Sequence, residues 1–103
     1  MIITIYEALV NDFRIRNALA LMIYAAQIRA ARALIGWRQE ELARAANVGL
    51  STIQKIEQTG GVVMGNVSTV MRLQQALEKA GINFLDTDPN GGPGVRWKNV
   101  PRV

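Results

Sequence analysis

The side chains with the clearest chemical use lie in residues 50–58. Ser51 and Lys55 are four residues apart and would share one face of a helix, while Ile53 and Ile56 would occupy the other face. A lysine ammonium group suits the O6 and N7 atoms of guanine, and a serine hydroxyl can donate to or accept from a base edge. The plainer interpretation is the solvated polar face that any amphipathic helix has. A sharp turn predicted just upstream favours contact with DNA over that interpretation.

Three neighbours of this face are further candidates for contact with bases. The Thr52 hydroxyl can donate or accept, and Gln54 lies at the edge of the face, where it could bind adenine or a phosphate. Leu50 has no hydrogen-bonding side chain, so it could touch a thymine methyl group or simply lie on the surface. The residues that we expect to contact bases are Leu50, Ser51, Thr52, Gln54 and Lys55.

Phosphate contacts are expected from the helix that precedes the turn. Gln39 at its start would present a side-chain amide and free backbone N–H groups, because helix N-termini favour anions. Arg38 and Arg44 are candidates for neutralising phosphate charge. Arg44 can instead pair with Glu40, four residues earlier, in a surface ion pair worth about 0.3–0.5 kcal/mol.

Apolar spacing predicts the helices that position these side chains. Apolar residues at intervals of three and four indicate a helix with one inward face. The predicted helices are 25–35, 39–46, 50–58 and a fourth from Asn66 or Ser68 to about Ala80. The inward face of the first is Ile28, Ala31, Leu34 and Ile35. Gly36 would end the first helix in the left-handed conformation, and Asn47 would make the left-handed turn between the second and third.

The residues after the fourth helix predict a hairpin. Ile82–Leu85 and Val95–Trp97 are short strand-like runs, and Asp88–Gly94 between them consists of turn-forming residues. A two-stranded hairpin is marginal alone, so it would pack on the helices or on a second subunit. Asp86 and Asp88 suit a turn, and nothing near them indicates a catalytic pair.

Composition excludes several kinds of site. The chain of 103 residues has no Cys and no His, which excludes thiol catalysis, imidazole acid–base chemistry and zinc sites built from those residues. We expect no enzymatic activity, no cofactor and no metal. The net charge of +4 is a mild bias toward anionic partners such as nucleic acid. A cytoplasmic location is the default without cysteines, and the apolar run Ala18–Ala26 is too short to span a membrane.

One set of residues follows the pattern of a known family. These residues are Arg29, Ala30, Leu34, Gly36, Gln39, Glu40, Leu42, Ala43, Ala46, Val48, Ser51, Thr52, Ile53 and Glu57. Through them, residues 28–57 resemble the Xre or Cro/phage-repressor type of helix-turn-helix. The longer segment 22–98 is similar to small bacterial members of that family, through Arg29–Arg32 and Gly92–Arg96. The resemblance implies sequence-specific DNA binding in transcriptional control, with repression as the expected role, and no substrate, metal or cofactor.

The resemblance also implies a fold class and a division of the chain. The expected fold is all-α, a compact four- to five-helix lambda-repressor-like DNA-binding domain with a short C-terminal β-hairpin or strand. We expect an N-terminal extension over residues 1–21, the helix-turn-helix domain over 22–81 and a tail over 82–103. Translation could instead begin at Met22. If residues 1–21 are translated, they would form an apolar extension that packs on a second subunit.

Glu57 and two arginines are interpreted through the same resemblance. The family often has a structural acid at the position of Glu57, and here it would pair with Arg29 or Arg32 on the first helix. Taken alone, those two arginines are also plausible phosphate contacts. Arg38 departs from the family pattern, because it stands where Ser or Thr usually caps the second helix.

The expected partners are double-stranded DNA and a second copy of the chain. Repressors of this family usually bind as dimers to half-sites about 34 Å apart. The fourth helix and the hairpin are the candidate dimer surfaces. The alternative function is a protein-interaction module that keeps the fold, such as an antitoxin that binds its toxin. No membrane partner is expected.

Overall fold

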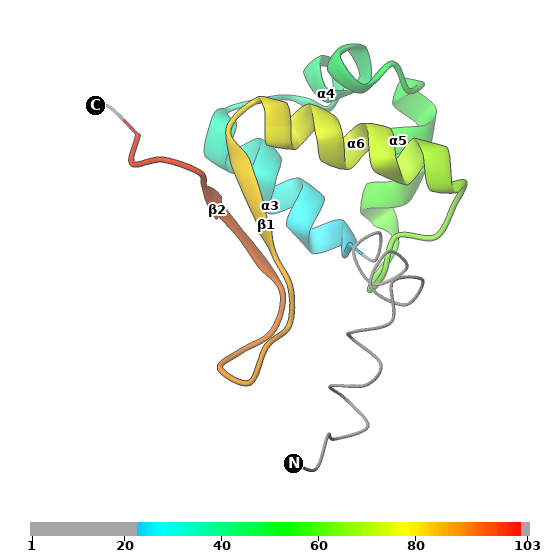
Figure 1. Cartoon of the computed structure of the whole chain (residues 1–103). Coiled ribbons are helices and arrows are strands. Elements are labelled where there is room, and N and C mark those ends of the chain that lie inside the picture. Colours follow the sequence, from blue (N-terminus) through cyan, green and yellow to red (C-terminus); the bar gives the residue numbers. More distant parts are fainter. Residues whose placement is uncertain (1–22, 102–103) are drawn as a thin grey trace.

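The chain folds as four helices followed by a two-stranded sheet in the part that the computed structural model describes, residues 23–101 (Figure 1). The expectations for residues 1–21 therefore lie outside the described residues. The elements are α3 (Ala25–Ile35), α4 (Gln39–Ala46), α5 (Leu50–Gln58), α6 (Val67–Lys79), β1 (Ile82–Leu85) and β2 (Gly94–Trp97). The domain is mostly helical, as expected, but the paired strands mean that it is not strictly all-α.

Two residues with positive φ end helices at the positions that the sequence predicts. Gly36 follows α3 with φ 70° and ψ 25°, and Asn47 follows α4 with φ 54° and ψ 49°. Side chains other than Gly, Asn and Asp rarely adopt this left-handed backbone. The α6 helix begins after Asn66, whose side-chain oxygen accepts from the Ser68 backbone N–H at 2.8 Å. Asn66, rather than Ser68, is therefore the N-cap.

One hydrophobic core joins the helices to the first strand. Its largest fully buried side chains come from every helix and from β1, and they are Ile28, Leu42, Ile53, Leu73, Leu77 and Ile82. The predicted inward face of α3 is correct for Ile28 and Ala31, which are fully buried. The same prediction is wrong for Leu34, which is 40% exposed, because the elements packed on α3 do not extend over that side of its last turn.

The hairpin packs on the helices of its own chain. In its antiparallel register, Ile82 pairs with Trp97 and Leu85 pairs with Gly94. The β1 strand contacts α6, and β2 contacts α3 (Figure 1). Phe84 and Trp97 pack against the core. The predicted hairpin is confirmed, and the helices supply the apolar support that an isolated pair of strands lacks.

Gln27 links α3 to the hairpin, although it is polar and only 5% exposed. Its Nε2 donates to the carbonyl oxygens of Gly94 at 3.0 Å and Leu85 at 3.3 Å. Its Oε1 accepts from the Tyr24 backbone N–H at 2.7 Å. A buried amide is stable only when its donors and acceptors are satisfied, and here the satisfied amide fixes the strands beside the start of α3.

In the described part of the chain, none of the helices combines the length and the apolar character needed to cross a bilayer.

Candidate nucleic-acid interface

The turn at Asn47 sets the direction in which α5 leaves α4. The Asn47 backbone N–H donates to the Arg44 carbonyl at 3.3 Å, and the Val48 N–H donates to the Ala43 carbonyl at 3.0 Å. Val48 packs against the core and so fixes the turn from inside. The two helices consequently lie at a marked angle to each other rather than continuing in line (Figure 1).

The α5 helix has one buried face and one exposed polar face. Ile53 and Ile56 are buried, while Ser51, Gln54 and Lys55 are exposed. The other two candidate base contacts, Leu50 and Thr52, are half-buried at the start of the helix. The predicted set therefore lies on α5, with three members fully on its solvent side. A helix that projects a short polar face in this way can hydrogen-bond to base edges in the major groove.

Glu57 holds the buried side of α5 against the two preceding helices. Its side chain is only 3% exposed and forms an ion pair with Arg32, whose Nε donates to Oε2 at 2.7 Å and whose second guanidinium nitrogen donates to Oε1. The Arg32 guanidinium also donates to the Trp37 carbonyl at 3.0 Å. Paired, two-point contact of this kind suits the planar guanidinium and gives the pair a defined geometry.

Of the two arginines that the sequence offers as ion-pair partners of Glu57, the structure shows which one contacts its carboxylate. Arg32 contacts the Glu57 carboxylate, whereas Arg29 donates to the Glu57 backbone carbonyl. Arg29 thus places positive charge at the C-terminal end of α5, where a cation interacts favourably with the helix dipole and stabilises the helix. Both guanidinium groups are engaged within the protein, which supports a structural role, and a contact of either arginine with phosphate stays a prediction.

Gln39 lies at the start of α4, but its amide points inward. The Gln39 Nε2 donates to Glu57 Oε1 at 3.2 Å, and the residue is half-buried. Its side chain therefore helps to orient α4 against α5, and the backbone N–H groups of the first turn are the part that remains suited to a phosphate. Sequence reasoning missed the inward contact, because the partner carboxylate is eighteen residues away along the chain.

The charges around the start of α4 are mixed. Arg38 and Arg44 are exposed. Glu40 and Glu41 lie in the first turn of α4, where acidic side chains stabilise the helix, and Glu41 Oε1 accepts from the Arg38 backbone N–H at 3.3 Å. That contact satisfies the backbone N–H of Arg38, whereas no Arg38 side-chain atom accepts from the N–H groups of the first turn. The same carboxylates weaken the attraction of this helix end for a phosphate.

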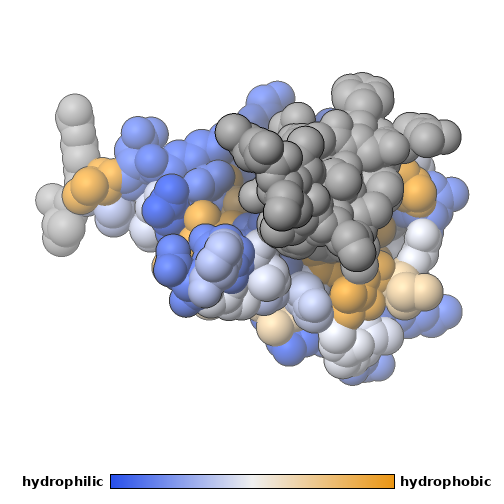
Figure 2. Space-filling model, turned by 60° about the horizontal axis from the view of Figure 1, so that its bottom comes forward, coloured by the Kyte–Doolittle hydropathy of each residue, from blue (hydrophilic) through white to orange (hydrophobic). Residues whose placement is uncertain are grey.

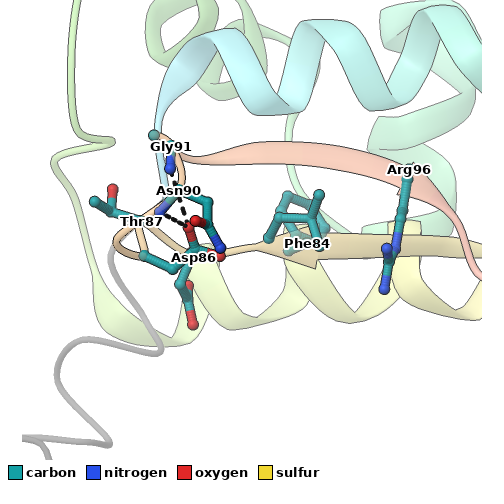
Figure 3. Close-up of a pocket in the computed structure, with 9 residues that line it drawn as sticks. Phe84, Asp86, Thr87, Asn90, Gly91 and Arg96 are labelled. Carbon is teal, nitrogen blue, oxygen red and sulfur yellow. Dashed lines mark hydrogen bonds between the residues drawn. The ribbon is translucent and has the colours of Figure 1, made fainter.

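A second surface feature lies at the tip of the hairpin and consists of a shallow hollow of about 500 Å³ (Figure 3). Phe84 and Arg96 line it on the strands. Asp88 Oδ1 accepts from the backbone N–H groups of Asn90 at 2.8 Å and Gly91 at 3.0 Å. The carboxylate thus closes the turn, as the sequence indicates, and the hollow follows from the shape of that turn. Among residues 23–101, no group of three or more His, Cys, Asp or Glu side chains is placed to hold a metal ion.

The order helix, left-handed turn, projecting helix defines the class of a DNA-binding helix-turn-helix domain. Comparison with family models gives the same answer, because the model described as "Helix-turn-helix" matches residues 28–58. The matched residues are similar to the helix-turn-helix of the Xre/Cro type, which is found in DNA-binding regulators. Comparisons with curated proteins and with solved structures gave no match.

Proposed function

We propose that the protein is a transcriptional repressor that binds a specific DNA operator through α5. The observation that supports this most strongly is the exposed face of Ser51, Gln54 and Lys55, held outward by the left-handed turn at Asn47. In this proposal the face lies in the major groove, and occupancy of the operator by the protein blocks transcription. The site of action is the cytoplasm, on chromosomal DNA.

The contacts divide into those that specify sequence and those that fix position. Lys55 donates to guanine, Gln54 to adenine or a phosphate, and Leu50 contacts a thymine methyl group. Ser51 and Thr52 complete the base-contacting set with their hydroxyl groups. Phosphates are bound by Arg38, Arg44 and the backbone N–H groups at Gln39, which supply affinity and register without reading sequence. The Gln39 side chain contributes indirectly, through its hydrogen bond to Glu57.

A homodimer is part of the proposal, because one projecting helix of nine residues reaches only a short stretch of groove. Two copies related by a two-fold axis would place their α5 helices in half-sites about 34 Å apart. The hairpin is the favoured contact surface. The edge of a two-stranded sheet has unpaired backbone groups on which another chain can pair.

The test is binding of fluorescent duplexes by the full chain, first with a random library and then with the duplexes selected from it. Binding to a selected duplex should fall steeply between 50 and 200 mM salt, by about 10³-fold or more if six phosphates are neutralised. The selected duplexes should also share a motif with two-fold symmetry. Absence of binding to selected and random duplexes alike at low salt would refute the proposal.

A second candidate function is a protein-interaction module that retains this fold, for example an antitoxin that binds a toxin. It is favoured by Leu50, which cannot hydrogen-bond to a base, and by the acidic Glu40 and Glu41 beside the expected phosphate position. On this alternative, α5 presents its exposed face to a protein. The binding experiment separates the two functions, because a pure interaction module binds no duplex.

A further inference from the structure

A hydrophobic surface lies on the first half of α6 and on the loop before it. Met64 is 80% exposed, Val67 is 57% exposed and Met71 is 39% exposed. Val67 and Met71 are four residues apart, so they share one face of the helix. We call these three residues the Met64–Met71 surface. A contiguous patch of exposed apolar side chains on a domain marks a candidate binding site.

The described part of the chain begins beside this surface. Tyr24 and Val62 form an antiparallel bridge, the Val63 N–H donates to the Ile23 carbonyl at 2.7 Å and the Ala25 N–H donates to the Gly61 carbonyl at 3.0 Å. In an antiparallel pair, one chain runs backward as the other runs forward. The bridge therefore places Ile23, the first described residue, beside Val63, the neighbour of Met64 in the sequence.

The preceding segment, residues 1–22, has the composition of an occupant for such a surface. Most of its residues are apolar, including Ile2, Ile3, Ile5, Leu9 and Phe13. Apolar side chains gain free energy when they leave water, and two apolar surfaces that meet both do so. On the face that Figure 2 brings forward, orange hydrophobic patches lie among blue hydrophilic ones.

We propose that residues 1–22 bind the Met64–Met71 surface of their own chain. The alternative occupant is residues 1–22 of a second copy of the protein. It is disfavoured because its concentration is lower than the effective concentration of the segment on the same chain. A short tether gives its two ends an effective concentration in the millimolar range, whereas a second copy is present at micromolar concentration in most experiments.

Photo-crosslinking of the full chain tests the proposal directly. A benzophenone amino acid at Met71 should form crosslinks to peptides from residues 1–22, and the same amino acid at Lys79, at the far exposed end of α6, should not. An equimolar mixture of light and ¹⁵N-labelled protein identifies the source of each peptide. Crosslinks within one isotopic form support the proposal. Mixed-isotope crosslinks, crosslinks to other segments, or no crosslink from position 71 would overturn it.

Proteolysis gives an independent measurement, because trypsin can cleave after Arg14 and Arg16 within the segment. The double substitution Val67→Glu and Met71→Glu should speed cleavage at these two sites about tenfold by making the surface polar. The matched control, Ser68→Glu with Gln75→Glu, adds the same charge at exposed neighbouring positions of α6 and should leave the rate unchanged. Equal cleavage rates in the two folded variants would contradict the proposal.

Discussion

The Glu57 carboxylate connects three helices through hydrogen bonds from two side chains. Arg32 on α3 and Gln39 on α4 both donate to it, and the Glu57 side chain is 3% exposed. A buried carboxylate of this kind costs free energy unless a positive charge and hydrogen bonds compensate for the lost water. The network therefore constrains the arrangement of α4 and α5 as well as adding stability.

Removing the charge of Glu57 should destabilise the domain by about 3 kcal/mol, because the Arg32 guanidinium is left largely buried without its counter-charge. The variant is Glu57→Gln, and the control is Glu40→Gln on the exposed side of α4, where we expect a loss of no more than about 1 kcal/mol from the helix dipole. Urea unfolding followed by circular dichroism measures both free energies. Equal stability of the two variants would show that the ion pair has no net structural role.

At the scale of the elements, the turn between α4 and α5 is the part with the strictest backbone requirement. Asn47 has φ 54°, and among residues 23–101 it is the one position other than glycine with positive φ. The substitution Asn47→Ala should cost about 1–2 kcal/mol, since alanine is strained in the left-handed region. Asn47→Gly should keep the stability within about 0.5 kcal/mol of the parent. Thermal unfolding of the two variants at equal concentration checks whether Asn47→Ala is the less stable one.

The hairpin offers a prediction about local rather than global stability. Gln27→Ala removes the donor for the Leu85 and Gly94 carbonyls and the acceptor for the Tyr24 N–H, at a cost of about 2–3 kcal/mol. Amide hydrogen exchange should accelerate most in β1, β2 and the first turn of α3. Gln75→Ala, on the exposed side of α6, is the control. Uniform acceleration across all helices would show instead that Gln27 stabilises the whole fold.

Much of this element-level description follows from the sequence. Apolar spacing predicts α3, α4 and α5, and Gly36 and Asn47 predict the ends of α3 and α4, because many helices end at a residue that tolerates the left-handed backbone. The α5 helix instead ends at Thr59 in an extended conformation. Gln27 and Leu34 could not be placed in this way. Periodicity tells which residues share a face of a helix, but it does not tell which other element packs on that face, and a polar residue can become buried when that element supplies its hydrogen-bond partners.

At the scale of the whole molecule, the proposal depends on two copies acting together. Analytical ultracentrifugation at tens of micromolar should give a species of twice the 11.3 kDa chain mass. A single species at the chain mass would contradict the dimer. It would leave the match of residues 28–58 to the helix-turn-helix family model intact, because that match does not depend on a second copy.

The modest net charge of +4 makes the position of individual cations more important than their total. Lys55 lies on the exposed face of α5, and Lys79 lies at the exposed end of α6. Replacing either lysine removes one positive charge and so weakens non-specific attraction to DNA to a similar extent. A loss of sequence preference, in contrast, is expected only where the lysine contacts a base.

The measurement that tests the central claim most directly is the base preference of Lys55→Ala and Lys79→Ala on single-base variants of a selected operator. For Lys55→Ala, the account predicts that discrimination at one base position falls by about 1–3 kcal/mol, while other positions keep their preference. For Lys79→Ala, the base preference at every operator position should remain unchanged. Unchanged preferences for Lys55→Ala, or equal losses for both variants, would contradict the claim that α5 reads DNA sequence through its exposed face.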